Sequence, residues 1–182
     1  MIKNANIGCG NRPIVGWLNY DNTPAIRIAN SPIKYFLLRK LKLINSLHIK
    51  NIEWNKRNKI KFADVRNPLP FQNNEIQCIY SCHMLEHLSK ETATFFLKEC
   101  LRSLSPKGIL RIVVPDLRQL VDSYILNGDA DLFYSSLHIT PPPIDTPRDK
   151  LKLLLIGGYR QHQCLYDSKS LKKILLKIGF EK

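Results

Sequence analysis

Short apolar runs alternate with longer amphipathic segments along this chain. The runs that suit β-strands lie just before Gly8 and at residues 17–21, 59–64, 76–81 and 109–114. The segments whose apolar residues recur at helical spacing are 89–104, 117–127, 168–178 and the shorter 151–156. Strands that alternate with helices predict an α/β fold with a parallel sheet covered by helices on both faces.

Capping residues and helix breakers mark several boundaries. Asp116 and Asp167 are expected to cap the two last long helices, and a glycine follows the end of each. Residues 105–108, Ser-Pro-Lys-Gly, are expected to stop the preceding helix. The run 109–114 is almost continuously apolar and rich in β-branched residues, which is typical of a strand that is covered on both faces.

A glycine turn follows the first predicted strand. Residues 6–10 read Asn-Ile-Gly-Cys-Gly. Gly8 and Gly10 lack a Cβ, so they can adopt positive φ and let backbone N–H groups approach a bound cofactor. The later glycine of the dinucleotide-binding fingerprint is missing, because Asn-Arg-Pro follows. The motif alone is equally compatible with an ordinary turn.

Two acids follow predicted strands. Asp21 ends the second strand and Asp64 the third, and ligands of parallel sheets bind at the carboxyl ends of strands. In dinucleotide folds an acid about 20 residues after the glycines binds the ribose. Asp21 comes only eleven residues after Gly10, so the crossover must be short, which disfavours a nicotinamide cofactor. Each acid can also be explained as a plain turn residue.

Length and charge complete the outline. The chain has 182 residues, 44% of them hydrophobic, which suits a single domain over 1–182. Its net charge of +13 is concentrated in segment 34–61, which predicts weak association with nucleic acid or an anionic membrane surface, or simply solvated helix faces. Residues 32–58 form a basic amphipathic insert. This insert suits a membrane surface, a roof over a substrate cleft, or packing against its own core.

Cysteines and hydropathy indicate the compartment. The five cysteines form an odd set without a Cys-x-x-Cys pair, so they predict ordinary thiols rather than a disulfide framework. No apolar run approaches the roughly 18 residues of a membrane span. We therefore expect a cytoplasmic protein.

Taken together, six segments of the chain resemble the class I S-adenosylmethionine-dependent methyltransferases, in particular the small type-11-like group. The segments that carry the resemblance are 6–10, 16–21, 64 with 68–71, 81–88, 104–108 and 113–117. The short gap before Asp21 is normal in that group. The resemblance implies a Rossmann-like three-layer sandwich with a mostly parallel central sheet and S-adenosyl-L-methionine as cofactor.

The resemblance also assigns roles to cofactor-binding residues. Gly8, Cys9 and Gly10 would face the methionyl part of the cofactor, and Asp21 would accept hydrogen bonds from the ribose hydroxyls. The adenine would lie against Asp64 and Val65. Ser81, at the end of the fourth strand, would lie beside the reactive methyl group.

The chain departs from the family pattern in three places. Asn6 stands where an acid often opens the glycine motif, the third glycine is replaced, and the chain ends where the last two strands would begin. We therefore expect the strand 109–114 to be a sheet edge, which a second copy or a partner subunit would cover. A catalytically impaired binding or assembly module is an alternative to an active enzyme.

A metal-binding alternative comes from residues 83–87. His-Met-Leu-Glu-His spells the inverted zinc-peptidase signature, which would make His83 and His87 zinc ligands of a hydrolase. That signature needs one long helix and a third ligand, whereas here a strand precedes the motif and a new helix begins at Ser89. We therefore expect no metal, and expect His87 to hold the loop.

The acceptor side is less defined. If the acceptor is a hydroxyl of a small molecule or glycan, His83 is the candidate base, because imidazole titrates near neutral pH. A solvent-facing loop histidine is the alternative. His162 and Asp116 are the candidate substrate-binding residues. RNA would suit the charge of the chain as an acceptor, and a lipid-linked acceptor would suit the insert.

Overall fold

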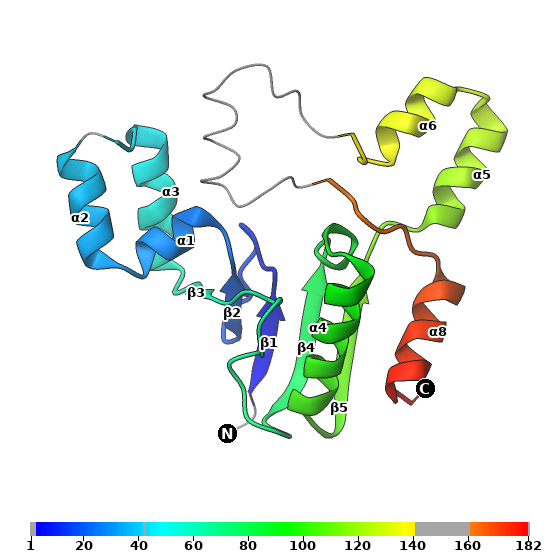
Figure 1. Cartoon of the computed structure of the whole chain (residues 1–182), viewed down its shortest axis with the longest axis horizontal. Helices are drawn as coiled ribbons and strands as arrows, with labels where there is room; N and C mark the ends of the chain where they lie inside the picture. The colour runs from blue at the N-terminus through cyan, green and yellow to red at the C-terminus, as the bar shows by residue number, and fades with distance from the viewer. Residues whose placement is uncertain (1–2, 42, 141–160, 182) are drawn as a thin grey trace.

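The computed structural model describes residues 3–41, 43–140 and 161–181. Its centre is a five-stranded parallel sheet in the order β3-β2-β1-β4-β5 (Figure 1). The strands are β1 (Asn4–Ile7), β2 (Leu18–Asp21), β3 (Lys61–Phe62), β4 (Ile76–Cys82) and β5 (Leu104–Val113). The predicted α/β fold with a mostly parallel, Rossmann-like sheet is confirmed. Because all strands are parallel, their carboxyl ends share one edge of the sheet.

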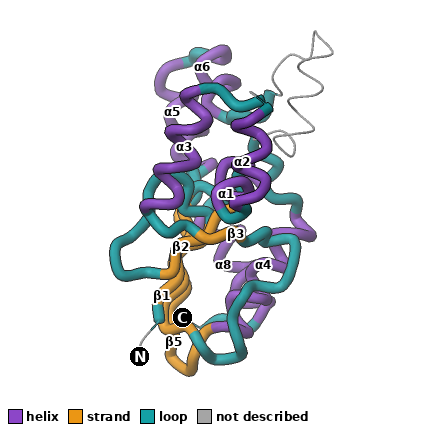
Figure 2. The backbone as a smooth tube through the Cα atoms, turned by 90° about the vertical axis from the view of Figure 1, so that its left-hand side faces the viewer, coloured by secondary structure: helices purple, strands orange, loops and turns teal. Residues whose placement is uncertain are grey.

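Two amphipathic helices cover one face of this sheet. They are α4 (Lys90–Ser103) and α8 (Ser168–Ile178), which lie against each other and against the sheet (Figure 2). Their apolar faces meet the strands in a core that includes Ala5, Ile79 and Phe96. Asp167 and Gly179 cap α8 as expected, since the Asp167 side chain accepts from Ser170 N–H and Gly179 has a φ of 113°.

The opposite face is less covered than expected. Ile109 is 62% exposed and Arg111 is also exposed, so the outward side of β5 is not buried by the described residues. The Arg111 guanidinium instead lies 5.8 Å from the Tyr80 ring centroid. Residues 8–17 connect β1 to β2 by turns, so this crossover also adds no helix to the sheet. Within the described ranges β5 pairs with β4 alone, as the expected edge strand.

The predicted helix stop at residues 105–108 lies within a bulge. Leu104 pairs with Ile76 and Ile109 pairs with Cys78, so four residues of β5 lie opposite Gln77. A Cβ on Gly108 would lie 2.8 Å from the Ser105 carbonyl oxygen, which explains the glycine. The helix α4 ends at Ser103 as predicted, but the chain enters the sheet at once instead of making a separate turn.

The basic insert 32–58 contains α2 (Pro32–Lys40) and α3 (Ser46–Arg57), and α1 (Pro24–Ala29) directly precedes it. Packing against an internal core is found for α1 and α3, where Ile26 and Ile52 are fully buried. It is not found for α2, which has no buried residue and whose Ile33 is 74% exposed. The Tyr35 hydroxyl donates to the Glu53 carboxylate, 2.9 Å away, which ties α2 to α3 by a polar contact.

Beyond β5 the chain forms α5 (Leu117–Asn127) and α6 (Ala130–Ser136). Asp116 caps α5 as predicted, while α6 was not predicted, although Asp129 caps it in the same way. The predicted helix over 151–156 lies outside the described residues. None of the helices that the structure describes is long and apolar enough to cross a membrane.

Candidate functional site

The glycine turn closes onto the end of β2. Gly8 and Gly10 have φ values of 71° and 51°, in the left-handed region that favours glycine. The backbone N–H groups of Gly8 and Cys9 both donate to the Tyr20 carbonyl oxygen, over 2.9 and 3.1 Å. The Gly10 N–H donates to Asp21 Oδ2 over 2.8 Å. The turn and the Asp21 carboxylate therefore form one unit at the carboxyl edge of the sheet.

The two glycines differ in their surroundings. A Cβ on Gly10 would meet no atom within 4 Å, whereas a Cβ on Gly8 would lie 2.6 Å from Met84 Cγ. Gly10 thus presents bare backbone to open space, and Gly8 lets the segment after β4 approach the turn. Open backbone beside a carboxylate suits a polar ligand that carries hydroxyl groups.

The Asp21 carboxylate is held in place and can still accept further hydrogen bonds. Besides the bond to Gly10, its Oδ1 accepts the Thr23 N–H over 2.9 Å. A carboxylate has about four lone-pair positions, so two acceptor sites remain after these bonds. Two acceptor sites on one fixed carboxylate suit vicinal hydroxyls such as those of a ribose.

Asn6 and Asn19 organise the crossover between β1 and β2. The sequence pattern places Asn6 in the glycine motif but predicts no role for Asn19. The Asn6 side chain donates to Asn19 Oδ1 and to the Arg12 carbonyl oxygen, both over 3.1 Å. Asn19 in turn bonds the N–H and the carbonyl of Ile14. Both amides are buried. Where an acid often opens the motif, this chain uses a neutral amide pair to fold the short loop.

The Cys9 side chain is directed into the protein. It packs with Ile26 and Ile60 in a small apolar cluster. Burial, with a further contribution from Asp21, raises the pKa of the Cys9 thiol to about 12. The thiol therefore stays protonated at neutral pH, and only the backbone of Cys9 belongs to the turn.

Asp64 lies after β3, near the end of β2. The Ala63 N–H donates to the Asp21 carbonyl oxygen over 3.1 Å, which joins the two strand ends. The Asp64 carboxylate receives Arg66 Nε at 2.9 Å and an Arg66 terminal nitrogen at 2.6 Å, and this hydrogen bonding lowers its pKa. Val65 is buried in the main core. An adenine amine at Asp64 would have to share the carboxylate with Arg66, so the adenine assignment stays a prediction.

Ser81 lies one residue before the end of β4, not at its end. It is paired with Ile112 in the sheet and is almost fully buried. Its hydroxyl has no hydrogen-bond partner among the described residues. A buried hydroxyl without a partner is unusual, but because it is buried, its contact with the cofactor stays a prediction.

His83 follows β4 in an unusual conformation. Its φ is 52°, which is rare for a residue with a side chain, and its N–H donates to the Val113 carbonyl oxygen over 2.9 Å. Its side chain is 58% exposed, and its Nδ1 lies 3.2 Å from Glu86 Oε1. Strained backbone of this kind clusters at functional sites, and the contact with Glu86 leaves Nε2 free.

The peptidase-like arrangement is not formed. His83 precedes a single 3-10 turn, η1 (Leu85–His87), and α4 begins separately at Lys90. His83 and His87 therefore do not share one face of a long helix, as the inverted zinc-peptidase signature requires. The zinc hydrolase alternative is wrong in its geometry.

A segment far along the chain covers η1. The N–H groups of Gln163 and Cys164 donate to the Glu86 carbonyl oxygen over 2.8 and 3.1 Å. His162 is thereby placed against η1, with its Nε2 4.0 Å from Glu86 Oε1. Asp116 also touches this segment through a bridge to Tyr166, but its side chain caps α5. The structure thus brings His83 and His162 to the same carboxylate, a grouping that the sequence did not predict.

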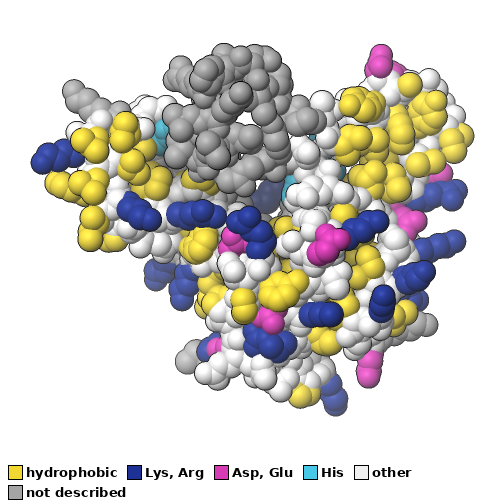
Figure 3. All heavy atoms as spheres, in the orientation of Figure 1, with side chains coloured by type: hydrophobic (Ala, Val, Ile, Leu, Met, Phe, Trp, Pro, Cys, Tyr) yellow, Lys and Arg dark blue, Asp and Glu magenta, His cyan; other side chains and the backbone are white. Residues whose placement is uncertain are grey.

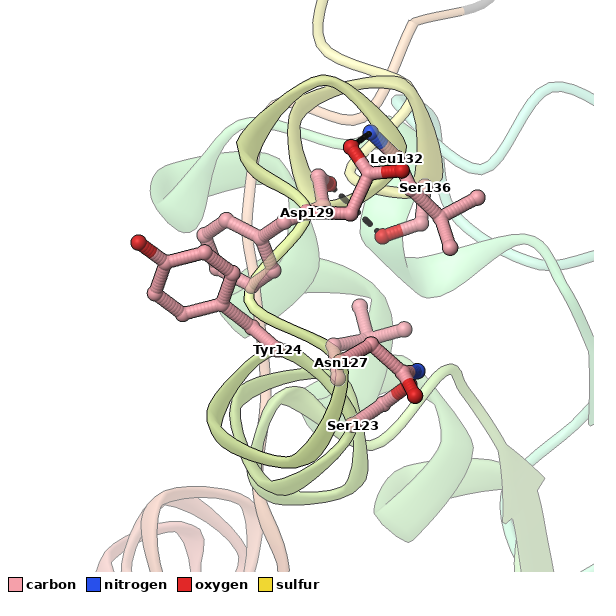
Figure 4. A pocket seen from close by; sticks show the side chains of 8 residues that line it. Ser123, Tyr124, Asn127, Asp129, Leu132 and Ser136 are labelled. Atoms are coloured by element: carbon pink, nitrogen blue, oxygen red, sulfur yellow. Dashed lines mark hydrogen bonds between the residues drawn. The ribbon is translucent and has the colours of Figure 1, made fainter.

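A separate pocket lies between α5 and α6. Its cavity of about 170 Å³ is lined by polar and apolar side chains of both helices (Figure 4). Residues that Figure 4 labels include Ser123, Tyr124, Asn127, Asp129 and Ser136. None of the predicted cofactor residues lines it.

Solved structures with similar folds are methyltransferases. One is a methyltransferase from Thermotoga maritima described as a possible histamine N-methyltransferase, with a TM-score of 0.55 and 15% identity over 99% of this chain and 64% of that one. A Methanosarcina mazei methyltransferase gives a TM-score of 0.54 and 16% identity over 98% of this chain and 79% of that one. An Archaeoglobus fulgidus methyltransferase gives a TM-score of 0.50 and 15% identity over 100% of this chain and 62% of that one. At these identities the likeness shows the fold.

The chain spans about two thirds or less of the Thermotoga and Archaeoglobus proteins. A search of curated proteins found no match. The family model described as a methyltransferase domain matches residues 5–112, which is more than half of the chain and includes the glycine turn, Asp21, Asp64 and His83. This chain therefore belongs to the methyltransferase-domain family of class I S-adenosylmethionine-dependent methyltransferases.

Proposed function

We propose that this protein transfers the methyl group of S-adenosylmethionine to a hydroxyl group of a small molecule or glycan. The observation that carries the proposal is the Gly10 to Asp21 hydrogen bond of 2.8 Å, which sets an open backbone turn beside a fixed carboxylate. In this arrangement the backbone of Gly8 and Gly10 holds the methionyl part of the cofactor. Asp21 holds the ribose, and Asp64 with Val65 holds the adenine.

The chemistry requires positioning more than activation. S-adenosylmethionine supplies, when bound, a methyl group on a positively charged sulfur. The acceptor oxygen forms a bond to the methyl carbon while the carbon–sulfur bond breaks, and the electron pair of that bond stays on sulfur, which leaves neutral. The protein must align the acceptor in line with this bond and remove the hydroxyl proton.

His83 accepts that proton in this proposal. Its Nδ1 faces the buried Glu86 carboxylate, so the neutral imidazole can keep its proton on Nδ1 and use Nε2 as the base. Once protonated, the ring would be stabilised by the carboxylate behind it. His162, which lies against the same carboxylate, and Asp116 are the proposed substrate-binding residues of the acceptor side.

Calorimetric titration of the protein with S-adenosylmethionine and S-adenosylhomocysteine tests the cofactor site. Binding of both ligands is the expected result. Failure of the folded protein to bind either one would contradict the proposal. It would favour the alternative of an assembly module, in which the open edge of β5 pairs with a second copy or a partner subunit.

Replacing His83 with alanine is expected to lower turnover at least about tenfold and to leave the affinity for S-adenosylmethionine unchanged, because general-base catalysis typically contributes this much or more. Methyl transfer to a panel of hydroxyl compounds, measured as S-adenosylhomocysteine formation, provides the test. The matched control is His48→Ala, which changes an exposed histidine of α3. Unchanged turnover in the His83 variant would remove this residue from the mechanism.

The basic insert supports a second activity, association with an anionic membrane surface. Figure 3 shows hydrophobic and basic side chains gathered over α2. Ile33, Phe36 and Leu37 are exposed there together with Lys34 and Arg39. Apolar side chains that insert below headgroups and cations that attract anionic lipid are the two parts of an interfacial helix.

Replacing Phe36 and Leu37 with serine is expected to weaken binding to anionic vesicles at least about tenfold, since burying such side chains contributes about 1.5–3 kcal/mol each. Cosedimentation with phosphatidylglycerol and with phosphatidylcholine vesicles measures it. Ile125→Ser, at an exposed apolar site on α5, is the matched control. If the variant instead retained binding and RNA competed with the vesicles in a salt-dependent way, the RNA alternative would replace this proposal.

A further inference from the structure

A cluster of metal-ligating side chains lies at η1, separate from the glycine turn. Glu86, His87 and His162 each offer one ligand atom, and these three atoms lie within 4.8 Å of one another. Two come from η1 and the third from the segment that covers it. The cluster uses two residues of the 83–87 motif but replaces His83 by a histidine distant in sequence.

Glu86 is the unusual member of the cluster. The residue is 1% exposed, and its Oε2 has no hydrogen-bond partner among the described residues. Its Oε1 lies 3.2 Å from His83 Nδ1 and 4.0 Å from His162 Nε2. A buried carboxylate oxygen without a partner is costly, and a bound cation would satisfy it.

The His87 ring is oriented by a backbone carbonyl, and the His162 ring packs against it. His87 Nδ1 lies 3.2 Å from the Gln161 carbonyl oxygen, which leaves Nε2 as the nitrogen that can bind an ion. The His162 Nε2 lies 4.0 Å from Glu86 Oε1. A second hydrogen bond that fixes the ring is typical of metal-binding histidines.

The backbone around the cluster is also fixed. The Gln163 side chain donates to the His87 carbonyl oxygen over 2.7 Å. Together with the two N–H groups that donate to the Glu86 carbonyl, this bond clamps η1 and the segment of His162 against each other. In a tetrahedral zinc site with bonds of about 2.1 Å, the ligand atoms lie roughly 3.4 Å apart. The three atoms here lie within 4.8 Å of one another, so side-chain movements of about 1 Å would complete the site.

We propose that Glu86, His87 and His162 bind one divalent transition-metal ion. Two imidazoles and one carboxylate suit zinc or a neighbouring metal, whereas magnesium and calcium prefer oxygen ligands alone. Three protein ligands leave a coordination position open. The inference goes beyond methyl transfer and does not depend on it, because it concerns binding by this cluster alone.

Titration of chelator-treated protein with zinc chloride, without cofactor or acceptor, tests the site. One equivalent of zinc is expected to bind. Glu86→Gln and His162→Asn are each expected to weaken it at least about tenfold, because the first replaces a charged carboxylate ligand by a neutral amide and the second removes an imidazole ligand. His48→Ala, which changes an exposed histidine elsewhere, is expected to bind like the unchanged protein. Zinc should also raise the melting temperature of the unchanged protein but not that of the Glu86 variant.

Two results would overturn the inference. One is zinc binding that is absent or equal in the unchanged protein and both variants. The other is a thiolate charge-transfer band after cobalt titration, which would place the ion at a cysteine. Circular dichroism identifies any variant that fails to fold, and His87→Gln then takes its place. Since no cofactor is present, these results are independent of whether S-adenosylmethionine binds.

Discussion

Replacing Asp21 with alanine is expected to weaken S-adenosylmethionine binding by at least about a hundredfold. The carboxylate has two acceptor positions left after its bonds to Gly10 and Thr23, and the proposed site gives them to the two ribose hydroxyls. Each hydrogen bond to a charged group contributes about 1.5–3 kcal/mol, and about 1.4 kcal/mol is a factor of ten in affinity. Calorimetric titration measures the loss.

The Asp21 variant needs a control for charge and for folding. Asp131→Ala removes an exposed carboxylate of α6 and is expected to leave the affinity unchanged. Asp21→Asn should give an intermediate loss, because the amide oxygen still accepts one of the bonds. A folded Asp21→Ala protein with unchanged affinity would show that the ribose is bound elsewhere.

Replacing Gly8 with alanine is expected to lower the free energy of unfolding by about 2–5 kcal/mol. The left-handed φ of 71° costs a residue with a side chain about 1–2 kcal/mol. The new Cβ would also overlap the Met84 side chain, 2.6 Å away, and overpacking of this kind costs about 1–3 kcal/mol. Urea denaturation measures the difference.

Gly10 is the matched comparison for Gly8. Gly10→Ala has a similar φ penalty but no overlap, so it is expected to lower the free energy of unfolding by only about 1–2 kcal/mol. In the proposed site its Cβ would also obstruct the cofactor. In a Met84→Ala background, the Gly8→Ala change should cost less than in the unchanged protein, because the overlapping atoms are gone. An equal decrease in the free energy of unfolding for Gly8→Ala and Gly10→Ala would show that the contact with Met84 does not constrain the turn.

The sequence predicted those parts of the fold that depend on local patterns. The four later strands, the caps Asp116 and Asp167, and the glycine turn all follow from residue periodicity and from the special conformations of a few residue types. The positions of Gly8, Gly10 and Asp21 were predictable for the same reason. The hydrogen bonds that join the turn to β2 span only eleven or twelve residues.

Features that depend on neighbours far along the chain were not predictable. The exposure of Ile109 depends on what packs against β5, and the bulge before it depends on the register with β4. The grouping of Glu86 with His162 requires the chain to return to η1, and no local sequence pattern predicts that return. Asn19 looked like an ordinary strand residue, because only its contacts with Asn6 and Ile14 show its role.

The two halves of the site therefore differ in how they assemble. The Gly10 to Asp21 bond spans 11 residues, whereas the bonds from His87 and Gln163 that hold the proposed acceptor side together span 74 and 76. Closing a longer loop costs more chain entropy, and such contacts form later in folding. The cofactor half can thus exist while the acceptor half is still open, so opening of the clamp over η1 would expose Glu86 and leave the glycine turn intact.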